Sequence, residues 1–99
     1  MLPHIGKPTY PIAVPIETNR GRGETRRIGP TRVTFATSEP FETGEALRFA
    51  MSLRGDGGQT LEVFCSGSVC GVSLDGALFV VEASIEESRI TIAKKEEER

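Results

Sequence analysis

The sequence holds few of the side chains that enzymes and metal sites depend on. Among 99 residues there is one histidine, one tyrosine, no tryptophan and two cysteines. The histidine, His4, is far in sequence from Cys65 and Cys70, so no metal-ligand spacing is present. Neither a nucleophile elbow nor a Walker loop occurs. We therefore expect no catalysis, no metal and no other cofactor.

Long apolar runs are also missing. No run approaches the roughly 18 residues that a membrane span requires. The start, "MLPHIGKPTYP", lacks the charged region and apolar stretch of a secretory signal. A net charge of -2 is too small to indicate general attraction to nucleic acid or to a membrane surface. We expect a cytoplasmic protein without a membrane or nucleic-acid partner.

The chain length predicts a single domain over residues 1–99. Residues 1–9, which contain Pro3, Gly6 and Pro8, are expected to form an extended leader. Residues 94–99, "KKEEER", are expected to form a charged tail. Cys65 and Cys70 are five residues apart in an expected strand, which places them on opposite faces and prevents a disulfide between them.

Apolar and polar residues alternate in several short segments, as in half-buried strands. "RGDGGQ" and Asp75-Gly76 are hairpin signals, and "EESRITIAKKEEER" is expected to be helical or frayed. These patterns predict an all-β fold: a small, six-stranded antiparallel barrel with a short C-terminal helix or tail. The expected strands cover residues 10–18, 25–37 with a break at Gly29-Pro30, 46–53, 61–70 and 77–85.

The phenylalanines of these strands, Phe35, Phe49 and Phe79, fall on the inward parity. A surface that stacks nucleobases would need exposed aromatics instead. This argues against one class of protein that has a small β-barrel, the oligonucleotide-binding barrel of the OB type.

Positive charge is concentrated in one stretch, "TNRGRGETRRIGPTRVTF", where a single acid, Glu24, opposes five arginines within thirteen residues. Guanidinium groups bind phosphate oxygens and stack on bases, so the stretch is a candidate site for an anion or a nucleotide. The alternative is a solvated turn. The candidate residues are Arg20, Arg22, Arg26, Arg27 and Arg32.

The order of features over about residues 10 to 92 resembles a PilZ domain, a small β-barrel family that includes receptors for cyclic di-GMP. "GETRRIGPTRVTFATSEPFETGEALRFAMSL" resembles the second and third strands of that family, and "ASIEESRI" resembles its passage into a C-terminal helix. The positions in register are Thr25, Arg26, Ile28, Val33, Phe35, Thr37, Pro40, Gly44, Leu47 and Leu53.

The ligand signatures of that family are not matched. Its Asp/Asn-x-Ser-x-x-Gly motif falls on Arg27, Gly29 and Arg32, none of which is the expected type. Arginine has donors only and cannot accept a hydrogen bond as Asp, Asn or Ser can. Its Arg-x-x-x-Arg motif should precede Tyr10, where no arginine occurs. The same spacing between Arg22 and Arg26 lies after the first strand and is interpreted as coincidence.

The resemblance thus implies a regulatory domain of the cyclic di-GMP system with degenerate ligand motifs. It is expected not to bind cyclic di-GMP and to act through an unidentified protein partner of a signalling assembly. The alternative is that the five arginines bind cyclic di-GMP or another anionic nucleotide.

Overall fold

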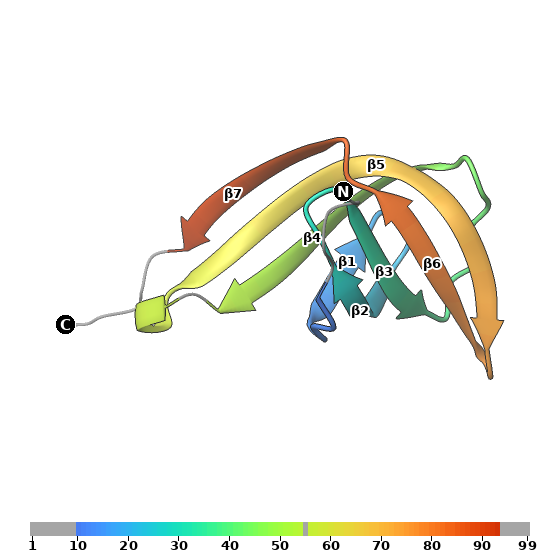
Figure 1. The fold of residues 1–99 in the computed structure, drawn as a ribbon, viewed down its shortest axis with the longest axis horizontal. Coiled ribbons are helices and arrows are strands. Elements are labelled where there is room, and N and C mark those ends of the chain that lie inside the picture. The colour runs from blue at the N-terminus through green and yellow to red at the C-terminus, as the bar shows by residue number, and fades with distance from the viewer. Residues whose placement is uncertain (1–9, 55, 94–99) are drawn as a thin grey trace, which may run out of the picture.

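The computed structural model describes residues 10–54 and 56–93, which form seven strands and one 3-10 turn (Figure 1). In chain order these are β1 Pro15–Thr18, β2 Arg22–Ile28, β3 Arg32–Thr37, β4 Ala46–Arg54, η1 Asp56–Gly58, β5 Thr60–Asp75, β6 Leu78–Ser84 and β7 Glu87–Ala93.

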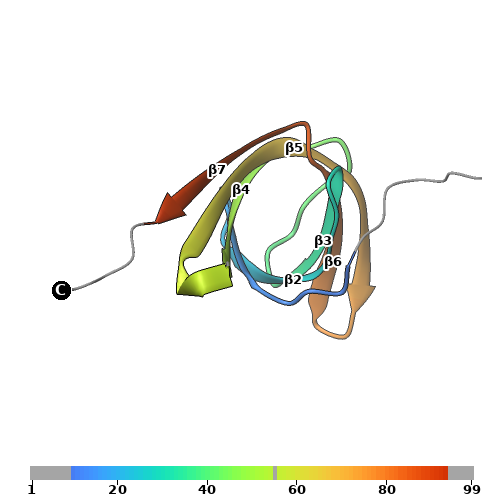
Figure 2. The same cartoon turned by 60° about the vertical axis from the view of Figure 1, so that its left-hand side comes forward.

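Six of the strands form a closed antiparallel barrel in the order β4-β1-β2-β3-β6-β5, which the pairing of β4 with β5 completes. Figure 2 looks into this ring, with β7 lying outside it. In the closed barrel each of these six strands has a neighbouring strand on both sides, so the barrel has none of the exposed edges of an open sheet. The prediction of an all-β, six-stranded antiparallel barrel is confirmed.

The alternating residues of the strands supply the core, as the sequence predicts. Phe35 is fully buried and meets Phe41 edge to face, with ring centroids 6.0 Å apart. Such a contact adds about 0.5–1.5 kcal/mol to the burial of the two rings. Other core residues are Ile16, Val33, Leu47, Phe49, Met51, Val63, Cys65, Val69, Val81 and Ala83.

The two predicted hairpins are confirmed. β5 ends at Asp75, and the turn into β6 contains Gly76, whose φ of 64° glycine adopts without strain. The other hairpin joins β4 to β5 through η1. The expected break at Gly29-Pro30 is a third turn, because β2 and β3 pair as antiparallel neighbours around it.

The first strand is shorter than predicted. Only Pro15–Thr18 forms a strand, although Tyr10 bridges to Ile28 farther along β2. Between them the backbone is irregular, and Thr25 of β2 fills the break with its side chain. Its hydroxyl donates to the carbonyl oxygen of Ile12 (2.6 Å) and accepts from the N–H of Val14 (2.8 Å). Residues 1–9, predicted as a leader, lie outside the described part of the chain.

The expectation of a C-terminal helix is wrong for the described residues, because Glu87–Ala93 is a strand, β7, paired with residues 60–66 of β5. β6 pairs with residues 69–75 of β5, so β6 and β7 follow one another along the same edge of that long strand. The β-branched sequence Ile90-Thr91-Ile92 favours this conformation. The predicted tail, 94–99, lies outside the described residues.

The long strand β5 has a bulge where it pairs with β6 and, just before it, a glycine that lies very close to β6. The register shift against β6 falls between Val69 and Gly71, so Cys70 is the bulged residue. Gly67 has another role, because β5 passes the end of β6 closely there. A Cβ atom on Gly67 would lie 1.8 Å from the carbonyl oxygen of Ser84.

The two cysteines are free, and they face opposite sides as predicted, with Cys65 buried and Cys70 exposed. Burial raises the pKa of the Cys65 thiol above its ordinary value of 9.0. The thiolate is the reactive form of cysteine. Burial therefore lowers the reactivity of Cys65 in two ways: it blocks access of a reagent, and it raises the pKa so that less thiolate is present.

We predict that a thiol reagent titrates one cysteine in the native protein and two in denaturant. Cys70→Ser should abolish the native reaction, whereas Cys65→Ser should leave it unchanged. Because the pKa of Cys65 is higher in the folded chain, the unfolded chain ionises first as the pH rises. The contribution of this group to stability is therefore complete below about pH 9 and is lost above it. Equal native reactivity of both cysteines would contradict the burial of Cys65.

Candidate functional site

The five candidate arginines lie on two neighbouring strands and the turn before them. Arg20 is in the turn between β1 and β2, whereas Arg32 begins β3. The other three, Arg22, Arg26 and Arg27, belong to β2. All five are exposed, as a ligand site on the outside of the barrel would require.

Arg20 acts as a clamp for the loop between β3 and β4. Its guanidinium forms an ion pair with Glu45 and donates to the carbonyl oxygen of Pro40 (2.8 Å). It also lies over the ring of Phe41, 5.2 Å from the centroid. A cation in this position is attracted by the face of the ring. The contacts of Arg20 are therefore those of a structural residue.

Arg22 and Arg26 each pair with an acid from a different part of the barrel. Nε of Arg22 lies 3.2 Å from Glu17, which is opposite it on β1. Nη1 of Arg26 lies 2.7 Å from the carboxylate of Asp75, at the tip of the β5–β6 hairpin. The two side chains are thus drawn toward opposite sides of β2.

Arg32 pairs with Glu82 of β6 at 2.7 Å. The hydrogen bond and the negative charge of Glu82 raise the pKa of Arg32. Arg27 is exposed near the end of β2 and also has an interaction of its own. Four of the five arginines therefore carry an acid at contact distance, supplied by four different segments.

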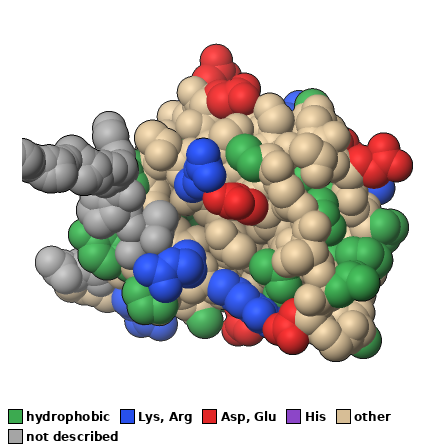
Figure 3. Space-filling view, turned by 45° about the vertical axis from the view of Figure 1, so that its right-hand side comes forward, with side chains coloured by type: hydrophobic (Ala, Val, Ile, Leu, Met, Phe, Trp, Pro, Cys, Tyr) green, Lys and Arg blue, Asp and Glu red, His purple; other side chains and the backbone are tan. Residues whose placement is uncertain are grey.

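The positive charge that is continuous in the sequence is consequently divided in space. On the face of the molecule in Figure 3, basic and acidic side chains lie among one another, without a continuous basic area. Exposed ion pairs contribute about 0–1 kcal/mol each, so they add little to stability. In addition, each carboxylate repels a phosphate from the guanidinium that would bind it.

The segment in register with the second ligand signature forms the β2–β3 turn. The N–H of Gly29 donates to the carbonyl oxygen of Arg32 (2.8 Å), and Pro30 has no N–H. The carbonyl oxygen of Thr31 accepts from the N–H of Ile85 (2.9 Å). The amides at Gly29 and Pro30 therefore offer no pair of free N–H groups to an anion, in contrast to a backbone nest.

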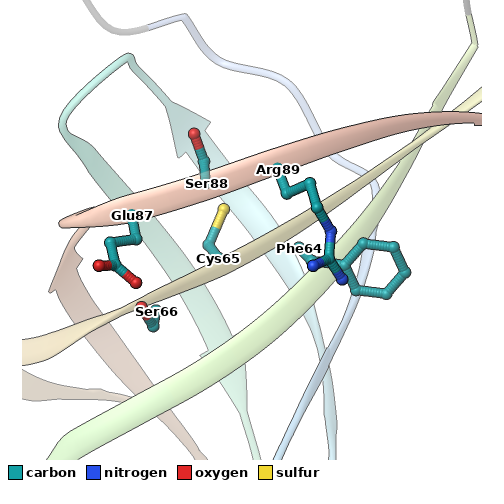
Figure 4. A pocket seen from close by; sticks show the side chains of 6 residues that line it. All are labelled: Phe64, Cys65, Ser66, Glu87, Ser88 and Arg89. Carbon is teal, nitrogen blue, oxygen red and sulfur yellow. The ribbon is translucent and has the colours of Figure 1, made fainter.

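A shallow depression of about 440 Å³ lies between β5 and β7 (Figure 4). In it, the guanidinium of Arg89 lies over the exposed ring of Phe64, 5.5 Å from the centroid. Glu87 is part of the same wall. The surface thus presents one cation, already stacked on a ring, beside one acid, which disfavours an anion.

Phe64 corrects the expectation that no aromatic side chain is exposed. It is 39% exposed, and Tyr10 is 55% exposed. The sequence contained the signal, because Phe64 has the opposite parity to its buried neighbours Val63 and Cys65. One such ring, covered by Arg89, does not form the row of exposed rings on which the bases of a single-stranded nucleic acid stack.

Within residues 10–54 and 56–93, no group of three or more His, Cys, Asp or Glu side chains could hold a metal ion. The same residues contain no helix of the length and apolarity that crossing a bilayer would demand. His4 lies outside the described residues.

Comparisons with known proteins agree with the fold. The solved structure of the Bacillus subtilis inhibitor of motility, MotI/DgrA, superposes with a TM-score of 0.76 at 13% sequence identity. The match covers 87% of this chain and 44% of that one, so the chain spans less than half the length of its structural neighbour. No protein-family model and no curated protein matches the sequence. The neighbour is a PilZ-type protein, and the chain therefore has a PilZ-like β-barrel fold.

Proposed function

We propose that this chain is a PilZ-like regulatory domain of the cyclic di-GMP signalling system that does not bind cyclic di-GMP and acts through contact with a protein partner. The likeness of its fold to that of MotI/DgrA supports the first part. The pairing of the arginines with acids is the observation that carries the second part.

A dianionic ligand would have to separate these pairs one by one. Arg32 and Glu82 are 2.7 Å apart, and so are Arg26 and Asp75. Moving the guanidinium groups away would leave the carboxylates close to the phosphates. The residues in register with the family signature, Arg27, Gly29 and Arg32, supply no acceptor side chain for the guanine edge.

The alternative is that the exposed arginines bind cyclic di-GMP or another anionic nucleotide in a different way. One observation favours it: the side chains of Arg22, Arg26 and Arg32 are 43–84% exposed. An exposed ion pair is weak and can exchange its partner.

Calorimetric titration of the protein with cyclic di-GMP distinguishes the two. We expect no saturable heat and no amide shifts over residues 20–32. Pyrophosphate serves as a probe for charge alone. A short single-stranded oligonucleotide, titrated in the same way, tests the oligonucleotide-binding class.

Two double variants make the test specific. Arg27→Ala with Arg32→Ala removes charge from the candidate site, whereas Arg48→Ala with Arg54→Ala removes equal charge from β4. If cyclic di-GMP bound to the unchanged protein and to the β4 variant but not to the first variant, the proposal would be wrong and the arginine site would replace it.

A further inference from the structure

β7 is an edge strand without the features that usually protect such an edge. It pairs with β5 on one side, and in the described residues no strand pairs with its other side. The reason lies in the topology: β3 begins at Arg32, which pairs with Ser84 at the end of β6, so β3 does not extend alongside β7. Its backbone N–H and C=O groups on the free side are available for another strand.

The side chains of β7 add exposed apolar surface to this edge. Ile90 and Ile92 are each 62% exposed, although they have the parity of the barrel interior. Their partners on β5 are Val63 and Leu61, and the next strand, β4, adds Met51 and Leu53. Two rows of apolar residues thus run across β4, β5 and β7, and each row ends at a solvent-exposed isoleucine.

An apolar hollow of about 210 Å³ lies on the same side, at the mouth of the barrel. Ile90 and Leu53 form part of its wall, and Ile28 at the end of β2 and Pro30 in the β2–β3 turn form another part. The apolar surface is therefore continuous from β7 into this end of the barrel. Natural edge strands are blunted by proline, lysine or an inward-pointing charge, and residues 87–93 contain no proline or lysine and have their charges, Glu87 and Arg89, on the outward parity.

The sequence of the strand is compatible with an antiparallel copy of itself. A two-fold axis through Thr91 would place Ile90 opposite Ile92 of the other copy, and Ile92 opposite Ile90. Thr91 would face its own copy, and Thr–Thr pairs are favourable across strands. The two Arg89 residues would be offset by four positions, about 13 Å along the strand, so no like charges would be opposed.

We infer that β7 is a dimerisation edge, at which two copies of this chain pair antiparallel about Thr91 and join their sheets into one. We choose a second copy as the partner because this pairing places the isoleucines of the two strands against each other and opposes no like charges. This inference goes beyond the proposed function and does not depend on it.

Light scattering coupled to size exclusion, over a range of protein concentrations, tests the association. The unchanged protein is expected to approach twice the chain mass of 10.7 kDa as concentration rises. Ile90→Lys with Ile92→Lys should remain monomeric and keep the β-sheet circular dichroism, because both side chains are already exposed.

The matched control places two lysines on another exposed apolar site. Leu74→Lys with Leu78→Lys changes the tip of the β5–β6 hairpin, where these residues are 71% and 38% exposed. It should dimerise like the unchanged protein. If the control also became monomeric, or if the unchanged protein were monomeric at every concentration, the inference would be overturned.

Cross-linking tests the register. In a Cys70→Ser background, Thr91→Cys should form a disulfide-linked dimer on mild oxidation, because each copy of residue 91 faces the other. Arg89→Cys should not, since its two copies lie too far apart for a disulfide. Equal cross-linking of both variants, or of neither, would overturn the antiparallel pairing about Thr91.

Discussion

Gly67→Ala is expected to lower the free energy of unfolding by roughly 3 kcal/mol, toward the upper end of what overpacking costs. A Cβ at this position would lie 1.8 Å from the carbonyl oxygen and 2.7 Å from the carbonyl carbon of Ser84. Both are backbone atoms, which cannot rotate away as a side chain can. Strands β5 and β6 would have to separate at the point where β5 passes from β4 to β6.

Several contacts depend on that close approach. The N–H of Ser68 donates to Oγ of Ser84 (3.1 Å), and the N–H of Glu86 donates to the carbonyl oxygen of Ser66 (2.8 Å). Separation of the strands would weaken both bonds. It would also disturb the start of β7, which follows directly.

Gly71→Ala is the matched control in the same strand. A Cβ there meets nothing within 4 Å, and the φ of Gly71 is not positive. Its effect should stay within about 0.5 kcal/mol. Urea denaturation measures both, and for a domain of this size each kcal/mol corresponds to roughly 4–8 °C in Tm. Equal midpoints for the two variants would show that Ser84 can move, contrary to the expectation.

Thr25→Val is expected to destabilise the fold by about 1–2 kcal/mol, because it leaves two partly buried backbone groups, the carbonyl oxygen of Ile12 and the N–H of Val14, without their partner. Thr25 is 1% exposed, and valine has nearly the same shape. The loss would come from the hydroxyl, which serves the carbonyl oxygen of Ile12 and the N–H of Val14. The backbone bond from the N–H of Thr25 to the carbonyl oxygen of Val14 (2.9 Å) would remain.

Thr25→Ser separates the hydroxyl from the methyl group. It keeps both hydrogen bonds and should lose about 0.8 kcal/mol for the missing methyl. Hydrogen exchange at the amide of Val14 should accelerate in the valine variant and not in the serine variant. If the valine variant proved more stable than the serine variant, the hydroxyl would not be the link that holds residues 12–14 to β2.

The contrast between Thr25 and the arginines shows why the candidate site was the harder part to predict. Thr25, Val33 and Phe35 have the expected side chain in register with the family, and all three are buried in the structure. The inward direction of Val33 and Phe35 follows from alternation along β3, and Thr25 lies on the neighbouring strand β2. The partners of Arg26 and Arg32, Asp75 and Glu82, are 49 and 50 residues away in sequence. No local pattern indicates such pairs.

The C-terminal strand β7 does not follow from the sequence for a similar reason. The likeness of "ASIEESRI" to the family's passage into a C-terminal helix predicts a helix or a frayed tail for this segment. The β-branched run Ile90-Thr91-Ile92 was the local signal for a strand. What decided the conformation was the free edge of β5 at residues 60–66, which pairs with the segment residue by residue.

By itself, the sequence determined the hairpins and most strands of the barrel, but not β7 or the start of β1, because the burial of alternate residues and the backbone freedom of glycine act over a few neighbouring positions. It determined a closed barrel, since short strands with regular turns have few other ways to cover their edges. The tertiary structure alone decided which acids pair with Arg20, Arg26 and Arg32, where β5 and β6 touch at Gly67, and that β7 pairs with β5 alone among the strands of the described residues. These depend on distances between segments far apart in the chain, which the folded backbone sets.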